Sequence, residues 1–323
     1  MSKAIISDHT FPSLDLQRNV LESAGFELYE IQPICTTEDA VIQKCADADV
    51  LLVQWCPITR RVLKSLPHLK AVVRYGIGVN NIDLEAAREF RVGVANVPTY
   101  CVEEVSTHAV AMIVSLAKRI PQDHYRIAHG EWGVGPLLPI PSLSDLILGL
   151  VGFGAIARRV APKARVFGFR IITSDPYLPD SVFAENGVER VNWETLLRSA
   201  DIISLHCPLL PETTHLINRH SIAKMKPGVM VVNTSRGPVI KEAELLEALE
   251  SGRIQAAGLD VFEQEPLPQE SVLRNLPNVL LTSHAASVSS RAVELLQIKA
   301  AESARDFLQG KRPESTLVWP SAT

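Results

Sequence analysis

The sequence has few cysteines and no clustered metal ligands. Five cysteines among 323 residues are an odd number, and none lies in a CxxC pair or beside grouped histidines. This usage argues against a disulfide framework and a zinc site, and it is typical of reduced thiols in the cytoplasm. We therefore expect a cytoplasmic protein with no metal site.

Long apolar runs and an excess of one charge are missing as well. The longest apolar candidates, such as residues 146–151, have the length of a strand and fall far short of the roughly 18 residues of a membrane span. The formal net charge is -4, with acidic and basic residues interspersed. Because no charged patch is evident, we expect neither nucleic acid nor a membrane as a partner.

The residues that are present predict two domains of alternating strands and helices. The chain is 46% hydrophobic and, at 323 residues, longer than one typical domain. Short apolar runs at 4–7, 50–54, 71–74 and 92–95, with helical patterns between them, predict one doubly wound unit. After a long amphipathic helix over 102–118, six further strands begin at 146, 170, 202, 229, 256 and 279. The predicted fold class is α/β with two parallel sheets, the second of the dinucleotide-binding type.

A glycine-rich turn between a strand and a helix indicates the nucleotide site. Gly152 permits a tight turn, Gly154 lets the backbone approach a pyrophosphate, and Ala157 allows close packing of the next helix. The N–H groups that begin this helix favour an anion. Asp175 ends the next strand, where a carboxylate accepts bonds from ribose hydroxyls and disfavours a 2′-phosphate. We predict NAD rather than NADP; the alternative is a plain turn with a helix-capping Asp.

Three later strand ends carry residues suited to hydride-transfer chemistry. Arg236, Glu265 and His284 follow successive strands, and ligands of open α/β sheets bind beyond the carboxyl ends of strands. An Arg binds a carboxylate through its planar fork, and a His can give a proton to a developing alkoxide. A nearby Glu favours the charged imidazole. Taken singly, the three could instead be a surface ion pair, a solvated acid and a core histidine.

The motifs resemble those of a known family over nearly the whole chain. The matching segments are Val73-Arg-Tyr-Gly-Ile-Gly-Val-Asn-Asn-Ile-Asp83, Asn96-Val-Pro98, Leu148-Gly-Leu-Val-Gly-Phe-Gly154, His206-Cys-Pro-Leu209, Pro211-Glu-Thr213, Met225-Lys-Pro-Gly228, Val232-Asn-Thr-Ser-Arg-Gly237, Leu259-Asp-Val-Phe262 and Ser283-His284. In this order they resemble the D-isomer-specific 2-hydroxyacid dehydrogenases, especially the branch of D-3-phosphoglycerate dehydrogenase and the C-terminal-binding-protein corepressors. The resemblance implies an NAD-dependent interconversion of a D-2-hydroxy acid and a 2-keto acid.

The resemblance also implies roles for individual residues. Arg236 would bind the substrate carboxylate, His284 would be the acid/base, and Glu265 would be its partner. Backbone amides around Tyr75 and Gly76 would hold the carboxylate from the other domain. The implied cofactor residues are His108, Gly152, Phe153, Gly154, Ala155, Ile156, Asp175, Cys207, Pro208, Thr213, Thr234, Ser235 and Asp260. Asp260 would face the nicotinamide amide, and packing on the helix surface is the alternative for His108.

The family architecture implies how the domains divide. Residues 1–100 and 291–323 would form a discontinuous, flavodoxin-like substrate domain, and residues 101–290 a Rossmann NAD-binding domain. Members are usually dimers, so we expect a homodimer whose other partner is the small-molecule 2-keto or 2-hydroxy acid.

Two other functions, and one residue that differs from the family pattern, bear on this interpretation. An NAD(H)-sensing, corepressor-like regulator would keep the same Arg, Glu and His. Formate dehydrogenase is disfavoured because that related family has Gln where this chain has Glu265. Ser287 stands where relatives often have an aromatic ring, which predicts room for a longer or polar substrate arm unless Tyr75 or Trp132 fills the gap.

Overall fold

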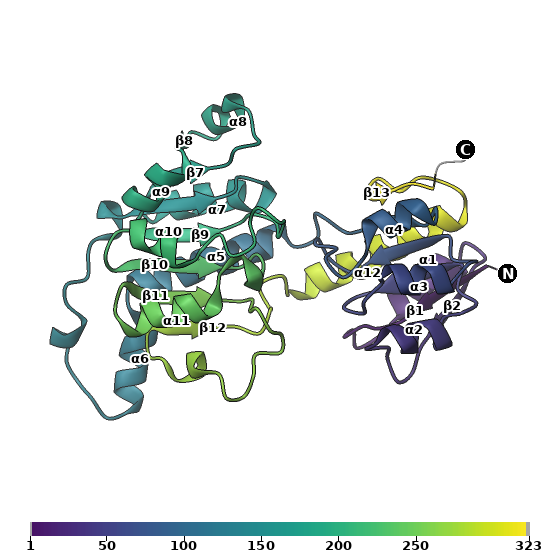
Figure 1. The fold of residues 1–323 in the computed structure, drawn as a ribbon, viewed down its shortest axis with the longest axis horizontal. Helices are drawn as coiled ribbons and strands as arrows, with labels where there is room; N and C mark the ends of the chain where they lie inside the picture. The colour runs from purple at the N-terminus through teal and green to yellow at the C-terminus, as the bar shows by residue number, and fades with distance from the viewer. Residues whose placement is uncertain (1, 321–323) are drawn as a thin grey trace. The chain divides into compact units, whose positions relative to one another are not determined.

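The computed structural model describes residues 2–320 and divides the chain into two compact units. Unit 1 combines the described residues up to Cys101 with those from Val288 onward, and unit 2 is Val102–Ser287. Each unit is built on one mainly parallel sheet with helices on both faces (Figure 1). The predicted fold class, α/β with two parallel sheets, is confirmed.

Unit 1 has a sheet of order β13-β5-β4-β3-β1-β2, the flavodoxin-like doubly wound order extended by one strand. Strands β1 to β5 are parallel, and β13 runs antiparallel to β5. Its elements are β1 (Lys3–Ile6), α1 (Asp15–Glu22), β2 (Glu27–Glu30), α2 (Glu38–Lys44), β3 (Val50–Val53), α3 (Arg60–Ser65), β4 (Ala71–Arg74), α4 (Leu84–Glu89), β5 (Gly93–Ala95), α12 (Ser290–Leu308) and β13 (Thr316–Val318).

The two faces of this sheet are covered by different helices. Side chains of α2, α3 and α4 form the core on one face, and those of α1 and α12 form it on the other. Strands β3 and β4 are buried along their whole length, which is why they are continuous apolar runs in the sequence. The edge strands β2 and β13 were not predicted from the sequence. Each buries a single residue, Leu28 in β2 and Val318 in β13, so neither is a continuous apolar run.

Unit 2 has a parallel sheet of order β12-β11-β10-β9-β6-β7-β8. Its elements are α5 (Val102–Ala117), α6 (Ile120–Ala128), β6 (Ile147–Val151), α7 (Ala155–Val166), β7 (Arg170–Ser174), α8 (Asp180–Glu185), β8 (Glu189–Arg190), α9 (Trp193–Ser199), β9 (Ile202–Leu205), α10 (Arg219–Lys224), β10 (Val229–Asn233), α11 (Glu242–Glu250), β11 (Ile254–Leu259) and β12 (Val279–Leu281). The six predicted strands are present; β8, two exposed charged residues, is additional.

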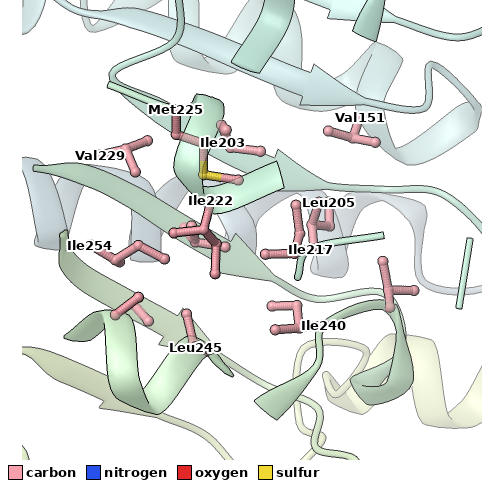
Figure 2. Packing of buried hydrophobic residues seen from close by; sticks show 14 of the residues in the cluster. Val151, Ile203, Leu205, Ile217, Ile222, Met225, Val229, Ile240, Leu245 and Ile254 are labelled. Atoms are coloured by element: carbon pink, nitrogen blue, oxygen red, sulfur yellow. The ribbon is translucent and has the colours of Figure 1, made fainter. Parts of the chain in front are cut away.

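The core of unit 2 also lies on both sides of its sheet. Figure 2 shows one side, where Ile222 of α10 and Leu245 of α11 point toward Ile203 and Ile254 on the strands. On the other side α5 and α7 pack against the sheet. Among residues 2–320, no helix is both long enough and apolar enough to cross a membrane.

The strand order positions the candidate site. The chain leaves β6 toward β7 on one side and returns to β9 on the other, so the connections after β6 and β9 diverge at the carboxyl edge of the sheet. Such a switch point opens a crevice in which ligands of doubly wound proteins bind. Gly152 follows β6, Thr234 follows β10, and Asp260 follows β11 at this edge.

Candidate active site

The glycine turn after β6 has the geometry of an anion site. Gly152 has a φ of +82°, and a Cβ there would lie 3.0 Å from the backbone N of Cys207. Helix α7 begins at Ala155, and Gly154 before it supplies no side-chain cap. The first-turn N–H groups, including those of Ala155 and Ile156, therefore have no intrahelical acceptor and can bind a negatively charged group.

Asp175 lies beside this turn and is fixed by backbone donors. Its Oδ2 accepts from the Phe153 N–H and its Oδ1 from the Tyr177 N–H, each at 2.9 Å. Phe153 is fully buried and its N–H donates to Asp175, so this residue supports the turn. Arg190 of β8, which the sequence analysis missed, donates to the Asp175 carbonyl at 3.1 Å and pairs with Asp180.

The loops after β9 and β10 carry the next predicted cofactor residues. The Thr213 hydroxyl donates to the Pro208 carbonyl at 2.6 Å and therefore ties its own loop together. Burial raises the pKa of the Cys207 thiol to about 11, so it is protonated at neutral pH. The Thr234 hydroxyl oxygen is buried without a hydrogen-bond partner. A buried hydroxyl without a hydrogen-bond partner lowers the stability of a protein. The Thr234 hydroxyl and the free N–H groups at the start of α7 are therefore suited to bind the polar groups of a dinucleotide.

The loop that carries Arg236 is shaped by a side chain to which the sequence analysis gave no role. Asn233 is fully buried; its Nδ2 donates to the Arg236 carbonyl at 2.9 Å, and its Oδ1 accepts from the Ser235 N–H at 3.0 Å. A Cβ on Gly237 would lie 1.8 Å from the Phe262 carbonyl oxygen. Only glycine allows this approach, which packs the Arg236 loop against the loop leading to the predicted acid/base partner.

The predicted acid/base pair is formed. Nδ1 of His284 lies 2.7 Å from Oε2 of Glu265, and Oε1 of Glu265 accepts from the Phe262 N–H at 3.0 Å. Burial raises the pKa of the Glu265 carboxyl, but the hydrogen bond and charge of His284, the Phe262 N–H and the charge of Arg236 outweigh it. The net pKa lies below the ordinary value of 4.5, so Glu265 is a carboxylate at neutral pH.

Asp260 organises the loop that carries His284. Its carboxylate is buried and accepts from the Thr282 hydroxyl at 2.6 Å, the Ala285 N–H at 2.8 Å and the Ala286 N–H at 3.1 Å. The His284 N–H donates to the Asp260 carbonyl at 2.8 Å. His284 itself has a φ of +55°, a left-handed conformation that is unfavourable for a non-glycine residue. These hydrogen bonds hold His284 in the left-handed conformation. Both carboxylate oxygens thus accept hydrogen bonds from the protein, and a contact of Asp260 with the nicotinamide amide stays a prediction.

His108 on α5 extends this arrangement. Its Nε2 lies 3.1 Å from the Thr282 hydroxyl oxygen and 3.8 Å from Oδ1 of Asp260. Because the hydroxyl donates to Asp260, the ring nitrogen must be the donor to the hydroxyl. His108 therefore contacts the loop of the predicted acid/base instead of only packing on a helix surface.

In unit 1, the amides that the sequence analysis selected are already engaged. The Tyr75 N–H donates to the Val53 carbonyl at 2.8 Å, and the Gly76 N–H donates to the carbonyl two residues before it at 3.0 Å. Within the described chain, the next two amides, those of Ile77 and Gly78, have no protein acceptor. The candidate anion-binding amides thus lie two residues further along. The Tyr75 side chain is 1% exposed, so it is unavailable to fill a substrate pocket.

Comparisons with known proteins identify the family of this chain. The model of the D-isomer specific 2-hydroxyacid dehydrogenase NAD binding domain matches residues 110–286. The chain belongs to this family. The predicted family, its dehydrogenase class and NAD as the cofactor are thereby confirmed.

Relatives and solved structures cover most of the chain. It is 38% identical over 287 residues to D-3-phosphoglycerate dehydrogenase of Methanocaldococcus jannaschii, which covers 88% of this chain and 54% of that protein. It is also 38% identical over 269 residues to hydroxypyruvate reductase of Thermotoga maritima, covering 82% of this chain and 86% of that one. A D-lactate dehydrogenase from Aquifex aeolicus, solved with NAD and lactic acid, has a TM-score of 0.86 at 26% identity. That comparison covers 99% of this chain and 100% of that structure. The chain thus spans about half the length of the first of these relatives and most of the other two.

Proposed function

We propose that this protein reduces small 2-keto acids to D-2-hydroxy acids with NADH, and catalyses the reverse reaction with NAD. The observation that carries the proposal is the His284–Glu265 pair, 2.7 Å apart, at the carboxyl edge of the NAD-binding sheet. The loop of Arg236 packs on the loop of Glu265 through Gly237, so a carboxylate-binding cation lies with the acid/base pair. Relatives that are named hydroxypyruvate, glyoxylate and lactate enzymes support the substrate class.

Three side chains have different roles in the proposed reaction. Arg236 binds the substrate carboxylate and orients the keto group. NADH, when bound, supplies the hydride to the carbonyl carbon. Nδ1 of His284 is engaged with Glu265, so we assign proton transfer to the carbonyl oxygen to Nε2. The carboxylate of Glu265 stabilises the imidazolium form before the proton is given up.

Unit 1 has candidate carboxylate-binding groups of its own. The N–H groups of Ile77 and Gly78, which have no protein acceptor within residues 2–320, replace the amides of Tyr75 and Gly76 in that role. Unit 1 is accordingly the proposed substrate domain, and unit 2 the NAD-binding domain.

The test is NADH oxidation, followed by absorbance, with glyoxylate, hydroxypyruvate, pyruvate and a longer keto acid. His284→Ala should reduce kcat about a hundredfold or more while NADH still binds, as expected for a positioned general acid. His215→Ala is a matched control, because His215 also has a left-handed backbone and pairs with a carboxylate, Glu263, at 2.6 Å. Near wild-type kcat in His284→Ala would contradict the assigned role.

A regulator that senses NAD(H) is the other function considered, and no comparison supports it. It would bind NADH tightly and turn over none of the four keto acids. That outcome would replace the enzyme proposal.

We further propose a cytoplasmic homodimer. All five cysteines are free thiols, which supports a reducing compartment. Helix α6 buries none of its residues, and the segment after it exposes Trp132 (90%), Val134 and Leu138. Such a cluster of exposed apolar side chains is typical of an interface. Trp132→Glu should give monomers in light scattering, whereas Val166→Glu, which changes an exposed apolar residue of α7 outside this segment, should not.

A further inference from the structure

The loop after β4 aims two backbone N–H groups in one direction. The Gly76 carbonyl accepts from the Val97 N–H at 3.0 Å, and the Ile77 carbonyl accepts from Nδ2 of Asn96 at 2.6 Å. Both peptides are trans, and in a trans peptide the C=O and N–H point in opposite directions. The N–H groups of Ile77 and Gly78 are therefore both directed away from the Asn96–Val97 segment.

Asn96 is itself held firmly. It follows β5, is 7% exposed, and its carbonyl accepts from the Ser315 hydroxyl at 2.6 Å. The next residue after Ser315, Thr316, pairs with Ala95 in the β13–β5 ladder. The side-chain amide that contacts the Ile77 carbonyl is thus fixed from the strand on one side and from the carboxyl-terminal segment on the other.

We propose that Asn96 is a positioning residue for substrate binding. Its side-chain amide fixes the Ile77–Gly78 peptide, so that the two N–H groups form a preorganised site for the carboxylate of a 2-keto acid. This inference rests on the proposed function. Donation to the Ile77 carbonyl also polarises that peptide, which strengthens its N–H as a donor. A carboxylate accepts two such bonds readily, because charge-assisted hydrogen bonds are stronger than neutral ones.

A purely structural role for Asn96, joining the β5 end to the loop, predicts different behaviour. If Asn96 had only this role, its replacement would lower thermal stability without a selective effect on KM for the keto acid. Asn81 is a matched control in the same unit, because its Nδ2 donates to another loop carbonyl, that of Cys56, at 2.9 Å. Asn96→Ala and Asn81→Ala each remove one bond of the same kind. Asn96→Asp preserves size and shape but replaces the donor with an acceptor.

The experiment measures KM and kcat for glyoxylate and hydroxypyruvate, and NADH affinity by fluorescence titration, in the full chain. We expect KM to rise about tenfold in Asn96→Ala, the effect of losing one well-placed hydrogen bond. The N–H groups of Ile77 and Gly78 would contact the carboxylate, which both acids share. KM should therefore rise equally for the two acids. NADH affinity should not change, kcat should fall much less than KM rises, Asn96→Asp should be at least as impaired, and Asn81→Ala should remain near wild type.

Several results would overturn this inference. KM in both Asn96 variants could stay within about twofold of the Asn81→Ala value, or rise for only one of the two acids. Loss of NADH binding in both Asn96 variants would show that the residue serves the fold as a whole. Failure of the proposed function looks different, because the wild-type protein would then reduce neither acid.

Discussion

Replacing Asp260 with alanine should disable catalysis by releasing the loop of His284, with little direct effect on the cofactor. The carboxylate of Asp260 is 1% exposed and accepts three hydrogen bonds, from Thr282, Ala285 and Ala286. Alanine leaves all three donors without their acceptor. The left-handed backbone of His284, at a φ of +55°, would then lose the contacts that hold it.

The magnitude follows from these contacts. Leaving a buried donor unsatisfied costs about 1–3 kcal/mol. The Ala286 N–H is buried, whereas the Thr282 and Ala285 donors are only partly buried and cost less, so the three together amount to about 2–5 kcal/mol. In a domain of this size, 1 kcal/mol shifts Tm by about 2–4 °C, so unit 2 should melt roughly 10 °C lower. Relaxation of the loop separates His284 from Glu265, and kcat should fall about a hundredfold, as for loss of the general acid.

The assay combines melting curves, kcat and NADH affinity for Asp260→Ala and for a control, Asp201→Ala. Asp201 lies at the other end of the sheet, before β9, and accepts from the Ile147 N–H and from Lys226 Nζ, each at 2.8 Å. The control should also melt lower but keep kcat within about twofold of wild type. If Asp260 instead acts by contacting nicotinamide, Asp260→Ala will keep its Tm and lose NADH affinity. That result would refute the present reasoning.

Three further predictions concern the cofactor, the pH profile and the substrate. Asp175→Ala should raise kcat/KM with NADPH relative to NADH, because the repelling carboxylate is lost while Arg190 remains beside the site; equal use of both by the wild type would contradict this. Glu265 has a lowered pKa and is ionised at neutral pH, so Glu265→Gln removes support for the protonated imidazole. Keto-acid reduction should then fail at a lower pH than in wild type, and a profile that stays or moves upward would exclude the coupling. Ser287→Trp should lower kcat/KM for hydroxypyruvate more than for glyoxylate, and an unchanged ratio would show that this position does not shape the pocket.

The sequence alone determined the elements whose physical cause is local. Strands β3 and β4 are buried on both faces, so their sequences are continuous apolar runs from which the strands can be predicted. Gly152 was predictable because its left-handed turn excludes most other residues. Arg236 and His284 could be placed at one edge because the carboxyl ends of parallel strands lie on the same side of a sheet.

Only the tertiary structure decided what the polar side chains contact. Asn96 and Ile77 are 19 residues apart in the chain, and Asp260 and Ala285 are 25 apart, so no periodic pattern links either pair. The amides of Tyr75 and Gly76 were plausible ligands until the sheet and the tight turn were seen to use both. Hydropathy reports how deeply a residue is buried, but a hydrogen bond depends on where the fold brings its second partner. For that reason the sequence located the candidate site, and the structure showed which of its groups are already engaged within the protein.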